Sequence, residues 1–139
     1  MRYGPLLVAL GGAAGATARY AISSAINARR EKAVIVTPKQ TPVGTMVVNV
    51  LGSFLIGVSF FGLNHRSNLW ALLLVTGFCG GFTTFSTAIV ESITLARAGH
   101  LRLAINSAIV TLAACALAII GGIAFGYWLA NLGSTPYLR

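Results

Sequence analysis

The chain has 139 residues, of which 56% are apolar and 9% are charged, against about 25% charged residues in an ordinary soluble domain. This composition excludes a water-soluble globular protein, whose surface needs many more charges. Ten Lys and Arg residues and only two acidic residues, Glu31 and Glu91, give a net charge of +8. The basic residues lie between apolar stretches, so we interpret them as charges that flank a membrane and not as a nucleic-acid-binding surface.

Uncharged apolar stretches divide the chain into four segments, each long enough for the roughly 20-residue helix that crosses a bilayer. They predict an all-α membrane protein with a single transmembrane domain over residues 1–139. The expected membrane helices are at about residues 4–27, 43–63, 69–97 and 101–130. We do not interpret the first segment as a cleaved signal peptide, because Arg19 lies inside it.

The distribution of basic residues predicts an orientation in the membrane. An even number of helices places both termini and the second loop on one side. That side holds three basic residues, and the other side holds six (Arg2, Arg66 and Arg139 against Arg29, Arg30, Lys32, Lys39, Arg97 and Arg102). The positive-inside rule therefore predicts termini outside the cytoplasm.

The richest polar stretch inside an apolar segment is residues 76–87, Thr-Gly-Phe-Cys-Gly-Gly-Phe-Thr-Thr-Phe-Ser-Thr. Its three glycines each weaken a helix by about 1 kcal/mol relative to Ala, and four hydroxyl residues lie within its last five positions. This pattern favours a broken helix, whose carbonyl groups suit a cation and whose N–H groups suit an anion. The alternative is that the glycines permit close helix packing and that the hydroxyls bond to their own helix.

Two other segments carry polar side chains on one helical face. Thr45 and Asn49 are four residues apart, and Ser107, Thr111 and Cys115 follow the same spacing. Asn49 could donate a hydrogen bond to an ion or could join two helices, and the residues of the second stripe could equally be small packing residues.

Pairs of glycines occur at spacings that let helices approach closely. Gly11 with Gly15 and Gly122 with Gly126 form small-xxx-small pairs, and the second predicted helix contains Gly52 and Gly57. These positions predict packing contacts.

Arg19 and Glu91 are the only charges well inside the predicted spans, since Arg97 and Arg102 lie at span ends. The Arg19 side chain can extend to the membrane interface, and Glu91, about one turn after Thr87, can accept hydrogen bonds from hydroxyls. A proton-carrying Glu usually has a carboxylate or histidine partner nearby, and the sequence indicates none. His65 and His100 both lie near loops, so the sequence offers no plausible set of titratable groups for an enzyme.

Three motifs together resemble the CrcB/Fluc family of fluoride channels. They are residues 11–20 (Gly-Gly-Ala-Ala-Gly-Ala-Thr-Ala-Arg-Tyr), residues 44–52 from Gly-Thr through Asn49 to Gly, and residues 77–87 with Glu91. The resemblance implies a channel that exports fluoride passively across the inner (plasma) membrane and so reduces fluoride toxicity. It also implies an antiparallel, dual-topology homodimer of four-helix subunits whose third helix is broken, with fluoride pathways at the interface.

The same resemblance assigns roles to individual residues. It implies a structural sodium ion at the dimer centre, held by the backbone carbonyls of Gly80 and Thr83 from each subunit. It makes Asn49 a pathway residue and Phe85 a member of an aromatic box along the pathway. The expected polar positions of the pathway are Thr45, Ser86, Thr87 and Thr111, with Ser107 at a position where many relatives carry Tyr.

The chain departs from the family pattern at a second position, since Ala88 stands where the second aromatic residue of the box is expected. This departure and the charge bias leave open one half of a heterodimeric fluoride channel. A small four-helix cation or drug exporter is another alternative, but such carriers need an acidic residue in the first helix, and this chain has none there. A structural four-helix scaffold would not require hydroxyls clustered beside three glycines.

Overall fold

The computed structural model describes residues 3–33, 43–62 and 68–132, and all regular structure in these ranges is helical. The elements are α1 (Gly4–Ala33), α2 (Val43–Gly62), α3 (Asn68–Trp70), the π-helix η1 (Ala71–Cys79), α4 (Gly80–Phe82), α5 (Phe85–Arg97) and α6 (Leu101–Leu132). Four stretches are long and apolar enough to cross a membrane: Gly4–Arg29, Val43–Phe60, Ala71–Arg97 and Leu101–Leu132. The prediction of an all-helical chain with four potential spans is confirmed.

The first membrane helix is predicted to end near residue 27 and the apolar span ends at Arg29, but the helix α1 itself continues to Ala33. Residues 28–33 are Ala-Arg-Arg-Glu-Lys-Ala, all good helix formers, so nothing in the sequence stops the helix where its apolar part ends. The last helix likewise continues two residues past the predicted end at residue 130, to Leu132. Several residues of the predicted charge pattern and loops lie outside the described residues: Arg2, Lys39, His65, Arg66 and Arg139.

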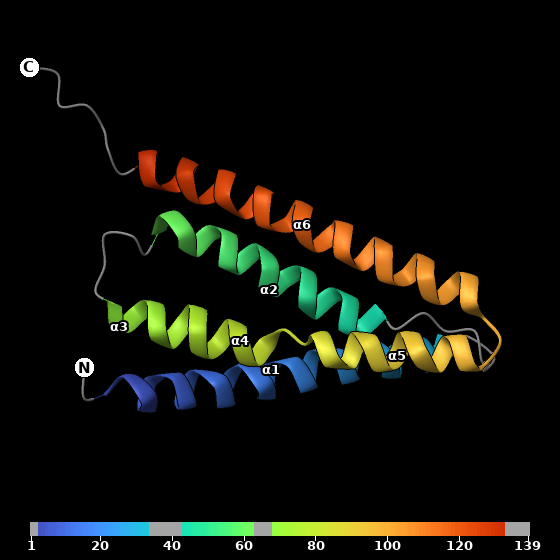
Figure 1. Ribbon diagram of the computed structural model, residues 1–139. Coiled ribbons are helices and arrows are strands. Elements are labelled where there is room, and N and C mark those ends of the chain that lie inside the picture. Colours follow the sequence, from blue (N-terminus) through green and yellow to red (C-terminus); the bar gives the residue numbers. More distant parts are fainter. Residues whose placement is uncertain (1–2, 34–42, 63–67, 133–139) are drawn as a thin grey trace, which may run out of the picture.

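The third potential span is irregular. It begins with the short α3 and the π-helix η1, which the sequence did not predict, and α4 ends at Phe82. Thr83 (φ −83°, ψ 153°) and Thr84 (φ −148°, ψ 112°) have extended backbone, and helical backbone resumes at Phe85. Figure 1 shows this interruption between α4 and α5. The Thr83 N–H still donates to the Cys79 carbonyl (2.9 Å), so it is the Thr84 N–H that the interruption leaves outside the helical hydrogen-bond ladder.

A tight turn at Gly99 connects α5 to α6. Gly99 has the only positive φ (83°) among the described residues. Its N–H donates to the Ala96 carbonyl (3.0 Å), and the His100 N–H donates to the Leu95 carbonyl (3.0 Å). This pairing satisfies carbonyls at the end of a helix and favours glycine, which adopts a left-handed conformation without steric cost.

The helices pack in two pairs. α2 lies beside α6, α1 lies along η1 and α4, and α5 also contacts α6 (Figure 1). Glycines form both contacts. A Cβ at Gly11 or Gly15 would collide with the backbone of η1, and one at Gly57 or Gly122 would collide with the backbone of the facing helix, α6 or α2. The prediction of close packing at these positions is confirmed.

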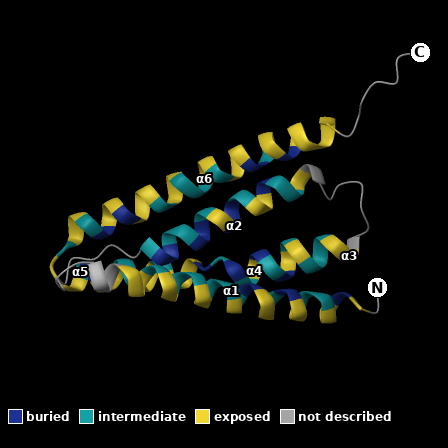
Figure 2. Cartoon of the chain, turned by 180° about the vertical axis from the view of Figure 1, so that it is seen from behind, coloured by how far each residue is buried: buried dark blue, intermediate teal, exposed yellow. Residues whose placement is uncertain are grey.

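The outer helix faces are largely exposed (Figure 2), and many of the exposed side chains are large and apolar. Among the large apolar side chains of the described residues only Val48 is fully buried, whereas residues such as Leu117 (69% exposed) and Ile120 (63%) on α6 face outward. A soluble protein rarely exposes apolar patches this large. The faces therefore suit lipid or another protein chain, as expected for membrane-spanning helices.

Replacing Gly57 by Ala is expected to lower stability by about 1–3 kcal/mol, the usual cost of forcing an extra methyl into a packed contact. The methyl would meet the Ile119 carbonyl oxygen, which is part of the α6 backbone and cannot move by a rotamer change. Gly121→Ala is the matched control, because nothing lies within 4 Å of its Cβ position and it removes the same helix penalty. Thermal unfolding of both variants in detergent tests the difference, and equal midpoints would contradict this account of the α2–α6 contact.

Candidate functional site

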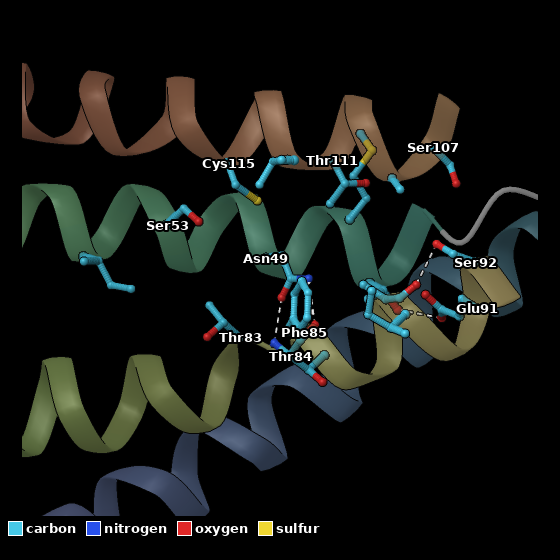
Figure 3. A pocket seen from close by; sticks show the side chains of 17 residues that line it. Asn49, Ser53, Thr83, Thr84, Phe85, Glu91, Ser92, Ser107, Thr111 and Cys115 are labelled. Carbon is cyan, nitrogen blue, oxygen red and sulfur yellow. Dashed lines mark hydrogen bonds between the residues drawn. The ribbon is translucent and has the colours of Figure 1, made fainter. Parts of the chain in front are cut away.

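A cavity of about 290 Å³ lies between α2, the α4–α5 junction, α5 and α6 (Figure 3). Apolar side chains form much of its wall. The polar groups come from three parts of the chain, and the main ones are Thr45, Asn49 and Ser53 on α2, Thr83, Thr84, Glu91 and Ser92 from the third span, and Ser107, Thr111 and Cys115 on α6. Both polar faces predicted from the sequence, on the second and fourth segments, therefore meet at one cavity.

The Asn49 side chain holds the extended backbone at Thr84. Its Nδ2 donates to the Thr84 carbonyl (3.0 Å), and its Oδ1 accepts from the Thr84 N–H (2.7 Å). Both residues are 8% exposed, so these bonds satisfy the buried N–H and C=O groups of Thr84 at the helix interruption. An amide carries two N–H donors, and the second makes no hydrogen bond within the described part of the chain. Asn49 thus joins two elements and retains one donor.

A cluster of hydroxyls surrounds the N-terminus of α5. The Thr84 hydroxyl donates to the Thr87 hydroxyl (2.9 Å), accepts from the Thr87 N–H (3.3 Å) and lies 3.4 Å from the Ser86 hydroxyl. This is the usual arrangement of a Thr that caps a helix. Ser86 and Thr87 are exposed and do not line the cavity, so these two predicted pathway residues lie apart from the group formed by Thr45, Asn49 and Thr111.

The Glu91 side chain is hydrogen-bonded to α2. The Thr45 hydroxyl donates to Glu91 Oε1 (2.7 Å), while Oε2 is buried and has no hydrogen-bond partner among the described residues. The expectation that Glu91 accepts from a hydroxyl is confirmed, although the donor comes from another helix. Arg19 is half-buried on α1, is absent from the cavity wall, and forms no ion pair within the ranges described.

The predicted sodium ligands lie at the helix interruption. The Thr83 N–H and hydroxyl both donate to the Cys79 carbonyl (2.9 Å each), and no hydrogen bond to the Thr83 carbonyl occurs among the described residues. Gly80 is exposed, with nothing within 4 Å of a Cβ position. Within the described residues, the Thr83 carbonyl therefore accepts no hydrogen bond, and the space beside Gly80 is free.

Phe85 stands at the edge of the cavity and is 79% exposed. Ala88 lies nearly one turn further along α5, and Ser107 faces the same cavity from α6. Ala88 and Ser107, the two positions noted as departures in the sequence analysis, therefore line the same cavity.

The sequence analysis missed two polar residues of the wall, Ser53 and Ser92. Ser53 follows Asn49 by four residues and shares its helical face, so the spacing contained the necessary signal. Ser92 donates to the Ala88 carbonyl of its own helix (2.8 Å), an ordinary intrahelical bond that no sequence pattern distinguishes.

Comparison with known proteins gives a consistent result. Residues 6–123 match the family model described as "CrcB-like protein, Camphor Resistance (CrcB)". The chain is 38% identical over 114 residues to the fluoride-specific ion channel FluC of Coxiella burnetii, covering 79% of this chain and 86% of that protein. It is 46% identical over 99 residues to FluC of Cereibacter sphaeroides, covering 71% and 74%. It is 38% identical over 127 residues to FluC of Chromobacterium violaceum, covering 89% and 94%.

The family match over residues 6–123 reaches into all four potential membrane helices, and the resemblance drawn from the sequence motifs is confirmed. With four helices that can cross a bilayer, the chain is a multi-pass membrane protein. It belongs to the CrcB family.

Proposed function

We propose that this protein is a fluoride-selective channel that lets fluoride leave the cell passively across the inner membrane. The observation that carries the proposal is the cavity between α2, α5 and α6, whose wall contains amide and hydroxyl groups and, in the described part of the chain, no Lys or Arg. The names of the relatives support the same function.

The chemistry of the wall suits a small, strongly hydrated anion. Such an ion leaves water only if other hydrogen-bond donors replace its hydration shell. The uncommitted N–H of Asn49 and the Thr111 hydroxyl are neutral donors, and the edge of the Phe85 ring carries a positive partial charge that can face an anion. A full cation would hold the ion too tightly for conduction, so the neutral donors of the wall favour passage. The Glu91 carboxyl group also lines the cavity, where its Oε1 accepts from the Thr45 hydroxyl.

The working unit we propose is an antiparallel, dual-topology homodimer. Support comes from the exposed apolar faces and from Phe85, a large aromatic side chain left 79% exposed in the single chain. In such a dimer the extended backbone at Thr83 and Thr84 is a break in the third membrane helix that lies at the interface.

A structural sodium ion would suit this break. Backbone carbonyl oxygens are ligands that hard cations prefer, and unwound helices in transporters coordinate sodium in this way. The Thr83 carbonyl accepts no hydrogen bond within the described ranges, and Gly80 leaves space beside its backbone. The carbonyls of these two residues would hold the ion, and its role would be to fix the break and not to take part in transport.

A heterodimer is the second candidate, and Ala88 is the observation that favours it. A partner chain could supply the aromatic ring that this position lacks, and the unequal distribution of basic residues would fix each chain in one orientation. The two candidates differ in whether this chain alone conducts.

Liposomes that contain only the purified chain test the function. They are loaded with fluoride, and an external electrode records its release. A potassium ionophore is added so that no membrane potential builds up against the fluoride efflux. We expect fluoride to leave down its gradient at equal internal and external pH. A strict requirement for a proton gradient would contradict a channel and would indicate a coupled carrier.

A further inference from the structure

We infer that Gly52 on α2 is a positioning residue for the proposed ion path, because its lack of a side chain leaves the space that the Thr83 side chain occupies. Gly52 is buried but does not line the cavity. A Cβ at this position would collide with Thr83 Cγ2 and would lie 3.2 Å from Phe82 Cδ1. The absence of a side chain at Gly52 is therefore what allows Thr83 to rest against α2.

The Thr83 side chain is held through both of its branches. Its hydroxyl donates to the Cys79 carbonyl (2.9 Å), and its methyl occupies the space above Gly52. A β-branched side chain has few allowed rotamers, so it cannot vacate this space by rotation without losing the hydrogen bond. A larger residue at position 52 must displace the Thr83 backbone.

Gly52 and Asn49 act on successive residues from one face of α2, since they are three positions apart in the helix. Asn49 fixes Thr84 through two hydrogen bonds of 3.0 Å and 2.7 Å, and Gly52 fixes Thr83 by shape. Together they set the direction of the Thr83 carbonyl and the placement of the Thr84 cap. Moving Thr83 away from α2 would also stretch the bonds between Asn49 and Thr84.

The inference rests on the proposed function only for its effect on transport, and four variants test it. Gly52→Ala is expected to reduce fluoride flux by about tenfold or more, because small displacements of positioned groups have large effects. Thr83→Ser keeps the hydroxyl and removes only the methyl, so its flux is the reference for the double variant. The double variant should recover to a similar level, because the colliding methyl is gone and the Thr83 Cβ lies 3.7 Å from the new side chain. Gly121→Ala is the control, with no atom within 4 Å.

Two further readouts separate positioning from stability. Loss of folded protein would lower the number of working channels without changing the ratio of fluoride to chloride flux, whereas a displaced Thr83 should lower that ratio in Gly52→Ala. NMR of the labelled Asn49 side-chain amide reports its bonds to Thr84 without any flux. Its resonance should shift in Gly52→Ala and return in the double variant.

The outcomes have distinct meanings. Wild-type flux in Gly52→Ala, or a folded Gly52→Ala variant that Thr83→Ser does not rescue, would overturn the inference. An unshifted Asn49 amide in Gly52→Ala would also overturn it. Absence of fluoride flux in wild type would instead contradict the proposed function, and the NMR comparison would still test the role of Gly52.

Discussion

Asn49→Asp is expected to reduce fluoride flux by at least about a hundredfold while the protein remains folded. The substitution places a carboxylate oxygen where Nδ2 now donates to the Thr84 carbonyl at 3.0 Å, so two acceptors would face each other. It also puts a negative charge beside the proposed anion path. Two like charges about 4 Å apart repel by roughly 4 kcal/mol at an effective dielectric constant of about 20, which corresponds to about a thousandfold lower occupancy.

Asn106→Asp is the matched control for this variant. It makes the same chemical change on α6 at an exposed residue that does not line the cavity, and it should retain flux. Both variants are compared with wild type by fluoride release from liposomes, with gel filtration to verify assembly. Normal fluoride flux in Asn49→Asp would contradict a role in the ion path and would show that Asn49 serves only in packing.

Phe85→Ile is expected to abolish fluoride flux, again by about a hundredfold or more, if the ring edge faces the ion. An aliphatic side chain of similar bulk has no positive edge, so it removes this interaction. Phe125→Ile is the control, because Phe125 is also a partly exposed aromatic residue (43%) but lies outside the cavity and stacks with Trp128 (5.7 Å). Unchanged fluoride flux in Phe85→Ile would show that the anion path does not pass this end of α5.

Ala88→Phe distinguishes the two assemblies in the same assay. If Phe85 alone suffices, wild type conducts well without a second ring. If a partner chain normally supplies that ring, wild type alone conducts poorly and Ala88→Phe increases the flux.

The membrane helices could be predicted because charges are sparse and, apart from Arg19 and Glu91, lie at the ends of the spans or between them. Their ends could not be placed as well, since the charged residues 28–33 continue α1 through their own helix propensity. The π-helix η1 has no sequence signature of its own. Nothing in local pattern separates it from an α-helix.

The site was predicted in part. Helical spacing alone placed Thr45 with Asn49, and Ser107 with Thr111, and the structure brings both pairs to one cavity. The bonds between Asn49 and Thr84 could not be predicted, because they join residues 35 positions apart. They also depend on which residue's backbone N–H and C=O groups the helix interruption leaves without helical partners. For the same reason Gly52 could be recognised as a position of close helix packing, but not as the residue against which the Thr83 side chain packs.

The central claim is that this chain alone forms a path for fluoride and not for larger halides. The most direct test measures fluoride and chloride release in parallel from liposomes that contain only the purified wild-type protein, against protein-free liposomes. We expect rapid release of fluoride and retention of chloride over the same period. Release of both ions at similar rates, or of neither, would contradict the claim.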